Sequence, residues 1–120
     1  MADHILVVED SEPVISAFRI LLEDAGYRVS QATTVAAALA IGRADPVDLM
    51  LLDLTLPDGD GLTALAELRR SGAPPRVTLA MTGDSEIETR QRCLAEGCAE
   101  VLVKPVPIKE LRDVIARHLS

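Results

Sequence analysis

The chain has 120 residues, a mass of 12.8 kDa and a formal net charge of −7, and this length is enough for one domain with a sizeable core. The acidic charge opposes nucleic-acid binding, and the only aromatic residues, Phe18 and Tyr27, are too few to form a platform for stacked bases. No apolar run approaches the roughly 20 residues that cross a bilayer and no signal-like segment opens the chain, so we expect one cytoplasmic domain over residues 1–120, without membrane contact.

Along the chain, short apolar runs alternate with amphipathic stretches, which predicts alternating strands and helices. The expected elements, in chain order, are a strand at 4–8, a helix at 11–25, a strand at 27–32, a helix at 35–43, a strand at 47–52, a helix at 62–71, a strand at 77–81, a helix at 85–95, a strand at 101–103 and a helix at 108–119. Ser11, and Thr33 or Thr34, are residue types that cap helix starts, and Gly26 is a type that ends helices. The unbroken apolar run at 47–52 is typical of a strand covered on both faces.

Five such strand–helix units, joined by right-handed crossovers, predict a doubly wound α/β fold of the flavodoxin-like (βα)5 type. A closed barrel would need about eight units, so we expect an open five-stranded parallel sheet, with the strand order 2-1-3-4-5 of the flavodoxin-like arrangement. In an open sheet of this kind, ligands bind outside the carboxyl ends of the strands. The residues that directly follow each strand are therefore the candidate functional residues.

Charged and polar side chains follow four of the five predicted strands. Glu9 and Asp10 come after the first strand, Asp53 after the third, Thr82 after the fourth and Lys104 after the fifth. If the first and third strands are neighbours, three carboxylates converge, and such a cluster needs a cation to stay ionised in a partly desolvated site. Carboxylate oxygens in this number suit Mg²⁺, which also keeps waters and binds phosphate oxygens.

Lys104 and Thr82 would add a positive charge and a hydroxyl donor, so the predicted site complements a phosphoryl group. Asp53 has no acidic neighbour in the chain, which leaves it free to act as a nucleophile and form an aspartyl phosphate. Singly, these residues also have structural explanations as helix caps, turn formers or surface charges. Their joint occurrence at the strand ends favours the functional interpretation.

Four motifs carry a resemblance that spans essentially the whole chain. They are VVED at 7–10, LLDLTLPDGDGL at 51–62, MTG at 81–83 and VKP at 103–105. This pattern resembles the receiver domain of two-component response regulators, and it is similar to the single-domain chemotaxis-type regulators. The resemblance implies a signalling domain that promotes its own phosphorylation and dephosphorylation and is not a turnover enzyme.

The resemblance also implies a role for each matching residue. Asp53 would accept a phosphoryl group from the phosphohistidine of a sensor histidine kinase or a histidine phosphotransfer protein. Asp10 and Asp53 would bind Mg²⁺ directly, Glu9 through a water, and Thr55 through its backbone carbonyl. Thr82 and Lys104 would contact the phosphoryl oxygens.

The family usually signals through the face formed by the fourth helix, the fifth strand and the fifth helix. A downstream protein or a fused output domain would bind there, and a dimer that forms on phosphorylation stays an open alternative. The family also tends to hold the Lys-Pro bond cis, so we expect a cis peptide between Lys104 and Pro105. The sequence departs from the family at Val101, where an aromatic residue often couples to the threonine, because a short β-branched side chain has nothing to swing.

Two positions border the path by which water would attack an aspartyl phosphate. Thr55 lies two residues after Asp53, and Asp84 lies two residues after Thr82. The sequence leaves open whether the Asp84 carboxylate repels or orients that water.

Two functions from other classes compete with this interpretation. A phosphatase of the haloacid dehalogenase type would need a second acid two residues after the nucleophile, where this chain has Thr55. A receiver-like docking module that works without phosphorylation is the second alternative, and the complete set of acids, threonine and lysine argues against it.

Several other patterns carry no functional prediction. The DGDG run at 58–61 lacks the glutamate of a calcium loop, and the turn EDSEP at 9–13 lacks the glycines of a nucleotide loop. Cys93 and Cys98 match no metal or redox spacing and are expected to be small, semi-buried residues. His4 and His118 are expected to be structural.

Overall fold

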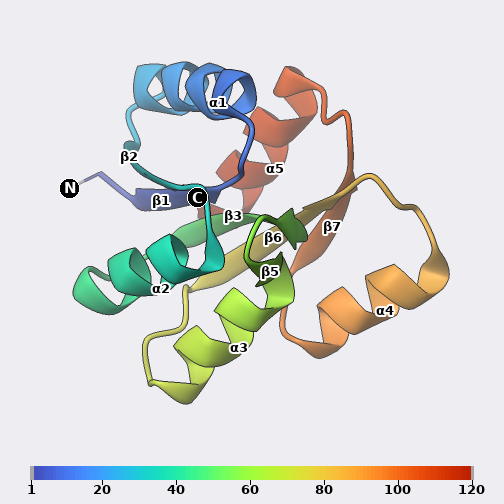
Figure 1. The fold of residues 1–120 in the computed structure, drawn as a ribbon. Helices are drawn as coiled ribbons and strands as arrows, with labels where there is room; N and C mark the ends of the chain where they lie inside the picture. Colours follow the sequence, from blue (N-terminus) through green and yellow to red (C-terminus); the bar gives the residue numbers. More distant parts are fainter. Residues whose placement is uncertain (1, 120) are drawn as a thin grey trace.

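The computed structural model describes residues 2–119, in which a parallel sheet of five strands lies between two layers of helices (Figure 1). The strands of this sheet are β1 (His4–Val8), β2 (Arg28–Ala32), β3 (Leu49–Asp53), β6 (Val77–Thr82) and β7 (Glu100–Val103). The helices are α1 (Glu12–Asp24), α2 (Val35–Ala44), α3 (Gly61–Arg70), α4 (Ile87–Ala95) and α5 (Ile108–Leu119). A separate antiparallel hairpin is formed by β4 (Thr55–Leu56) and β5 (Gly59–Asp60).

The strand order of the sheet is β2-β1-β3-β6-β7, and every neighbouring pair is parallel. Because β6 and β7 are the fourth and fifth strands of this sheet, the order confirms the predicted 2-1-3-4-5 arrangement. The doubly wound (βα)5 fold is confirmed with it. The chain order reverses between β1 and β3, so the crevice in which ligands bind lies at the carboxyl ends of these two strands.

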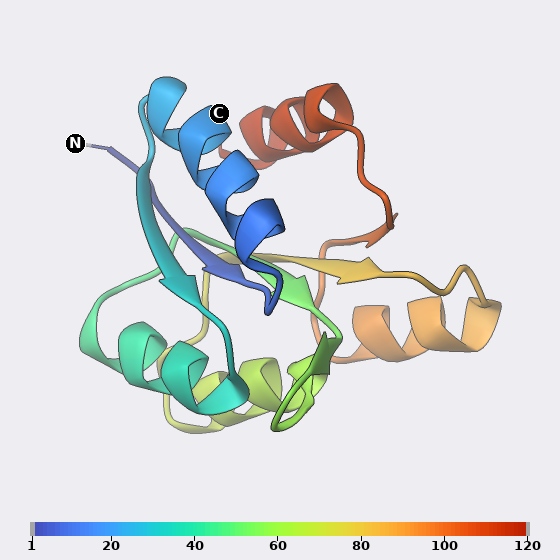
Figure 2. The ribbon, with the colours of Figure 1, turned by 45° about the horizontal axis from the view of Figure 1, so that its top comes forward.

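Helices α1 and α5 cover one face of the sheet, and α2, α3 and α4 cover the other (Figures 1 and 2). The side chains of β1 alternate between the two cores: Ile5 and Val7 pack toward α1 and α5, whereas Leu6 and Val8 pack toward α2 and α3. This double burial explains why the strand is apolar at every position. None of the helices in the described part of the chain has the length and hydropathy that a membrane crossing requires.

The segment between Asp53 and α3 differs from the prediction, because a short hairpin stands where we expected a loop. Two of its acids serve as helix caps, which fixes the hairpin in place. The Asp60 carboxylate accepts the backbone N–H of Leu62 at the start of α3. The Asp58 carboxylate reaches across to the start of α2 and accepts the N–H groups of Val35 and Ala36. The DGDG run is therefore a capping segment, which agrees with the exclusion of a calcium loop.

Other differences concern element boundaries. Helix α4 begins at Ile87, two residues later than predicted, because the Asp84 carboxylate accepts the backbone N–H of Glu86 and holds the preceding residues in a turn. Strand β3 runs from Leu49 to Asp53 and is shifted by one or two residues from the predicted 47–52. Thr34 caps α2 through its side chain, whereas Ser11 stands at the start of α1 without a side-chain capping bond.

The amino edge of the sheet contains a buried polar cluster around His4, which is only 1% exposed. Its Nδ1 is 2.8 Å from the carbonyl oxygen of Pro46, and its Nε2 is 2.7 Å from Oγ of Ser30. Its backbone N–H donates to the carboxylate of Asp48 at 2.7 Å. Each ring nitrogen therefore has a hydrogen-bond partner, and Nδ1 also lies 3.9 Å from a carboxylate oxygen of Asp45, which agrees with the structural role predicted for His4.

Candidate functional site

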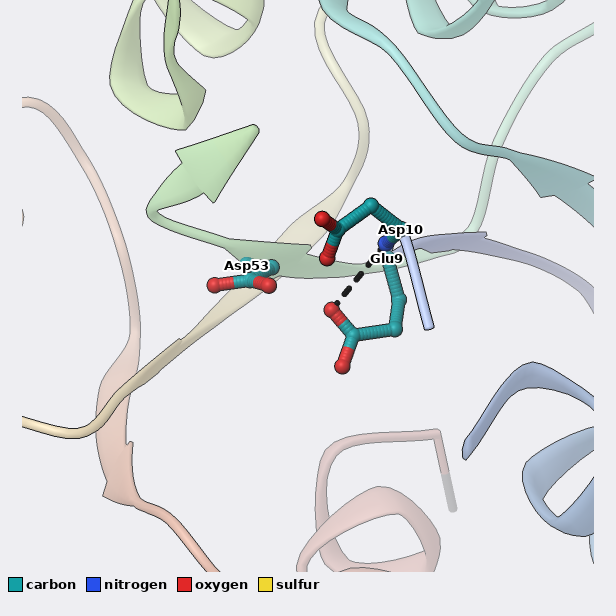
Figure 3. A group of neighbouring side chains, drawn as sticks. All are labelled: Glu9, Asp10 and Asp53. Carbon is teal, nitrogen blue, oxygen red and sulfur yellow. Dashed lines mark hydrogen bonds between the residues drawn. The ribbon is translucent and has the colours of Figure 1, made fainter. Parts of the chain in front are cut away.

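The carboxyl edge of the sheet brings together three acids from two neighbouring strands (Figure 3). Strands β1 and β3 pair in parallel with Val8 opposite Leu52, so the next residue on each side, Glu9 after β1 and Asp53 at the end of β3, lie side by side. One carboxylate oxygen from each of Glu9, Asp10 and Asp53 lies within 4.8 Å of the others. Glu9 and Asp53 are buried and Asp10 is exposed, so the cluster is open to solvent on one side.

The backbone of Asp53 is braced by the start of α3. The N–H of Gly61 donates to the carbonyl of Leu54 at 2.9 Å, and a Cβ atom at Gly61 would lie 2.1 Å from the carbonyl oxygen of Asp53. No residue with a side chain fits such a close approach of two backbone segments. Gly61 therefore sets how closely α3 supports the end of β3, a role that we did not predict from the sequence.

Lys104 reaches the acids from the end of β7. Its Nζ lies 2.9 Å from Oδ2 of Asp53 and 3.1 Å from Oε1 of Glu9. The peptide between Lys104 and Pro105 is cis, as predicted. Within the described residues, the cluster thus has three carboxyl groups and one ammonium group, which pairs with Glu9 and Asp53 but not with Asp10.

Two opposite pKa shifts follow from this crowding. Burial, together with the Asp53 carboxylate beside it, raises the pKa of Glu9 to about 7. Burial also acts to raise the pKa of Asp53, but hydrogen bonds with Glu9, Lys104 and the backbone N–H of Thr55 outweigh it and lower that pKa. Of the two, Asp53 is therefore the more readily ionised group at neutral pH.

The acid cluster fits a hard divalent cation. Oxygen ligands from carboxylates, with room for waters on the exposed side of Asp10, are the donor set that Mg²⁺ prefers. A cation would also offset the negative charge that Lys104 leaves unpaired. The residues present thus agree with the predicted metal chemistry.

Thr82 ends β6 and is 7% exposed. Its Oγ accepts the backbone N–H of Asp84 at 3.0 Å, and within residues 2–119 it makes no hydrogen bond to Asp53. The Thr55 side chain is exposed, and its backbone N–H donates to Oδ1 of Asp53 at 3.1 Å. Thr55 thus bonds to the acid cluster through its backbone and Lys104 through its side chain, whereas Thr82 makes no hydrogen bond to Asp53 within the described residues.

Asp84 does not point its carboxylate at the acid cluster. Its two oxygens accept the N–H of Glu86 and the hydroxyl of Thr89, both at 2.7 Å. These two bonds lower the pKa of Asp84, Thr89 having the larger effect. The sequence left open whether the Asp84 carboxylate repels or orients an attacking water. In this structure both of its oxygens are bonded to the start of α4 instead.

A mostly apolar groove of about 600 Å³ adjoins the acids on the side of α1. Its lining includes Val14 and Phe18 from α1, Met81 from β6, and Pro105 and Val106 after β7. The polar site therefore has an apolar surface directly beside it.

The comparisons with known proteins agree with this geometry. Residues 5–116 match the model of the response regulator receiver domain family. This match covers most of the chain, so the chain belongs to the response regulator receiver domain family. The 2-1-3-4-5 sheet with an acid cluster at its carboxyl edge agrees with that assignment. It is a receiver domain of the two-component signalling type.

Curated relatives include transcriptional regulators. The chain is 36% identical over 117 residues to the alginate biosynthesis transcriptional regulatory protein AlgB of Pseudomonas putida, and the match covers 98% of the chain and 26% of AlgB. It is 36% identical over 119 residues to the KDP operon transcriptional regulatory protein KdpE of Escherichia coli, covering 96% of the chain and 52% of KdpE. The chain thus spans about a quarter of the length of AlgB and about half of KdpE.

Solved structures with the same fold include the chemotaxis protein CheY4 of Vibrio cholerae, at 27% identity and a TM-score of 0.92, covering 99% of this chain and all of that one. Another is the receiver domain of the sensor histidine kinase PA1611 of Pseudomonas aeruginosa, at 28% identity and a TM-score of 0.85, covering 98% and 97% of the two chains. The PA1611 structure has a magnesium ion coordinated in its active-site cleft.

Proposed function

We propose that Asp53 is the phosphoacceptor of this receiver domain and takes its phosphoryl group from the phosphohistidine of a sensor histidine kinase or a histidine phosphotransfer protein. The observation that carries the proposal is the buried, ionised Asp53 carboxylate with Lys104 at 2.9 Å. In the transfer, an oxygen of Asp53 forms a bond to phosphorus while the phosphorus–nitrogen bond to the donor imidazole breaks. The electron pair of that bond stays on the imidazole nitrogen.

The residues around Asp53 have distinct proposed roles. Asp10 and Asp53 would hold Mg²⁺ directly, Glu9 through a water, and Thr55 through its backbone carbonyl. When bound, the ion would neutralise charge that builds up on the phosphoryl oxygens. Lys104 and Thr82 would contact those oxygens, and Lys104 also keeps Asp53 ionised before the reaction.

A partner surface is proposed on α4, β7 and α5. Ile87, Leu94, Val103 and Ile108 are large apolar side chains on these elements, and each is more than 40% exposed. Exposed apolar groups on neighbouring elements are typical of binding surfaces. This face would bind a target protein or an output domain, or a second copy of the phosphorylated domain, and not nucleic acid.

The proposal also includes the extent of the domain, its location and the fate of the aspartyl phosphate. Residues 1–120 would act as one receiver unit in the cytoplasm, and the aspartyl phosphate would be a signal and not an intermediate of steady turnover. Thr55, the residue two after Asp53, offers no second carboxyl to act as the general acid of a phosphatase.

The test is to incubate the protein with acetyl phosphate and Mg²⁺ and to record its intact mass. We expect one phosphate adduct in the wild type and in Asp58→Asn, an acid change outside the cluster, and no adduct in Asp53→Asn. Chelation of Mg²⁺ should also prevent the adduct. A protein that stays unlabelled, or that is labelled without Asp53, would exclude the phosphoacceptor role and favour a docking module that works without phosphate.

A further inference from the structure

The groove beside the acids, on the side of α1, is lined by side chains of the core. Its volume of about 600 Å³ lies within the range of pockets that hold small molecules. Phe18 and Met81 in its lining are buried, Val14 and Val106 are half-buried, and all four pack in the core beneath α1 and α5. These two helices cover the same face of the sheet (Figure 2). The groove is therefore a concave apolar surface held in shape by the fold.

A second groove, of about 430 Å³, lies on the side of the β4–β5 hairpin and has a different character. Its lining includes Thr82, Asp84, Asp60 and Arg92, and the last two form an ion pair at 3.0 Å. An apolar group placed there would cover charged and polar atoms without replacing their hydrogen bonds to water. Of the two grooves, the one beside α1 is therefore the one that suits an uncharged apolar group.

The apolar groove and the proposed phosphoryl site share three residues. Glu9, Asp10 and Lys104 belong to the site and also line one end of the groove. A molecule whose phosphoryl group lies at Lys104 therefore has the groove directly beside it. The two acids at this end would repel a negatively charged tail, whereas an uncharged apolar tail would gain from burial. The arrangement thus fits a phosphoryl head joined to an apolar tail.

We propose that this groove is a subsite for the acyl chain of small acyl phosphates, and that it selects donors with an uncharged apolar chain longer than acetyl. This inference rests on the proposed role of Asp53 as the phosphoacceptor. In the transfer, an oxygen of Asp53 forms a bond to phosphorus while the bond between phosphorus and the acyl oxygen breaks. The electron pair stays on that oxygen, so the donor leaves as a carboxylate anion and no proton has to move.

The first experiment compares two donors that differ only in the length of the acyl chain. Acetyl phosphate and butyryl phosphate release carboxylates of similar acidity, so their intrinsic reactivities are alike. With Mg²⁺ present and each donor well below saturation, intact mass gives the initial rate of adduct formation. We expect butyryl phosphate to react about tenfold faster, since burial of its two additional CH₂ groups favours it. Equal rates would overturn the subsite and leave the groove to an apolar side chain of a protein donor.

Ala17 offers a change in the groove that does not touch the acids. It is an exposed residue of α1 in the lining of the groove, and Ala40 is its matched control, because both are exposed alanines at the sixth position of their helices. Ala17→Gln puts an amide into the groove and should reduce the preference for butyryl phosphate to below threefold. Ala40→Gln, on the opposite face of the sheet, should keep it near tenfold. Equal preferences in the two variants would contradict the placement of the acyl chain.

Val106 gives a second route to the same readout if Ala17→Gln folds poorly. Val106→Thr keeps the shape of the side chain but puts a hydroxyl on the wall of the groove, so it should also lower the preference for butyryl phosphate several-fold. A preference that stays near tenfold in both groove variants would overturn the subsite.

Phosphoramidate separates the subsite from the phosphoacceptor, because this donor has no acyl chain. We expect it to label the wild type and all three variants at rates within twofold of one another. If no donor gives an adduct, phosphoramidate included, the proposed function and the subsite are overturned together. A normal adduct from phosphoramidate without a preference for butyryl phosphate would overturn the subsite alone.

Butanoylphosphonate measures binding without transfer, because its acyl group is joined to phosphorus through carbon and is not displaced by Asp53. In the presence of Mg²⁺, we expect it to shift the NMR signals of Phe18 and Val106 more than acetylphosphonate does. Shifts confined to Asp60 and Arg92 would place the chain in the polar groove and overturn the proposal.

Discussion

The two edges of the central sheet both contain buried polar side chains, but they differ in whether the charges there are balanced by neighbouring groups. At the amino edge, both ring nitrogens of His4 have a neutral partner, Ser30 or the carbonyl of Pro46. At the carboxyl edge, three carboxylates cluster, and the single ammonium group of Lys104 pairs with two of them, Glu9 and Asp53. The first arrangement is complete by itself, whereas the second leaves negative charge to be met by a ligand.

This difference teaches how to separate a structural polar cluster from a functional one in the same fold. Burial alone does not separate them, since His4 and Glu9 are equally inaccessible at 1% exposure. The balance of donors, acceptors and charges separates the two clusters. A buried charge without a partner destabilises a fold, so it is retained where binding needs it.

Replacing His4 should destabilise the fold without affecting the acid site. His4→Leu leaves the carbonyl of Pro46 and the hydroxyl of Ser30 without their partner, which should lower the free energy of unfolding by about 2–4 kcal/mol. Urea denaturation measures this change, and intact mass measures the phosphate adduct, which should form normally. His118→Leu, at a half-buried position on the last turn of α5, serves as the control, with a loss below about 1 kcal/mol. Loss of the adduct in folded His4→Leu would contradict the separation of the two edges.

Metal-free stability should depend on pH through Glu9. Its folded-state pKa of about 7 lies above its ordinary value of 4.5, so the folded chain binds more protons than the unfolded chain between these values. Stability therefore falls as pH rises from about 4.5 through about 7, by roughly 3 kcal/mol, and levels off above that range. The lowered pKa of Asp53 acts in the opposite sense, but only in more acidic solution.

Urea denaturation in the presence of a chelator, at a series of pH values, measures this dependence. Glu9→Gln should flatten the curve over this range, and Glu110→Gln, an exposed change on α5, should not. Added Mg²⁺ should restore stability at pH 8 in the wild type. A curve that is flat or rises between pH 5 and 7 in the wild type would show that the carboxyl edge is as balanced as the amino edge.

Removing the exposed acid should weaken the metal and spare the fold. Asp10→Asn is expected to reduce Mg²⁺ affinity by roughly 10-fold to 100-fold, with little change in urea stability, because the carboxylate lies at the surface of the cluster. Titration calorimetry measures the affinity. Asp113→Asn, at an exposed position of α5, is the matched control and should bind Mg²⁺ as the wild type does. Equal affinities in the two variants would remove Asp10 from the proposed ligands.

The smallest effect is expected where a strand end carries a cap instead of a functional group. Thr34 follows β2 at the carboxyl edge and accepts the N–H of Ala37 at 3.0 Å. Thr34→Ala should cost about 1 kcal/mol of unfolding free energy, while Thr34→Ser should cost less. Neither change should alter Mg²⁺ affinity. A change in affinity would mean that the site extends to β2, which sequence reasoning excluded.

The fold and the position of the site were predictable because the signals are local. Each candidate residue directly follows an apolar run, and the carboxyl ends of neighbouring parallel strands meet at one edge, so Glu9, Asp53 and Lys104 had to converge. The alternation of apolar runs and amphipathic stretches predicted the strand–helix units, and the strand order was expected from the flavodoxin-like arrangement that such units adopt.

The features that escaped prediction depend on partners that are distant in the sequence. Asp58 caps α2 from 23 residues away, and no local pattern marks the pair. The contact of Gly61 with the backbone of Asp53 is visible only in three dimensions, although a glycine as the first residue of a helix is a usable hint. Asp84 could be placed near the site, but the direction of its carboxylate depends on Thr89 in the next helix.

The close contact between Gly61 and Asp53 also has a mechanical meaning. Asp53, the proposed acceptor, rests on the backbone at the start of α3, a stiff support that side-chain motion does not loosen. Any travel needed for transfer then falls to the incoming donor and to the groups around the acceptor. An engineer could therefore vary the hairpin that joins the two residues, provided that its length is kept. A larger residue at position 61 would instead displace the backbone of Asp53 and, with it, the carboxylate around which the rest of the site is arranged.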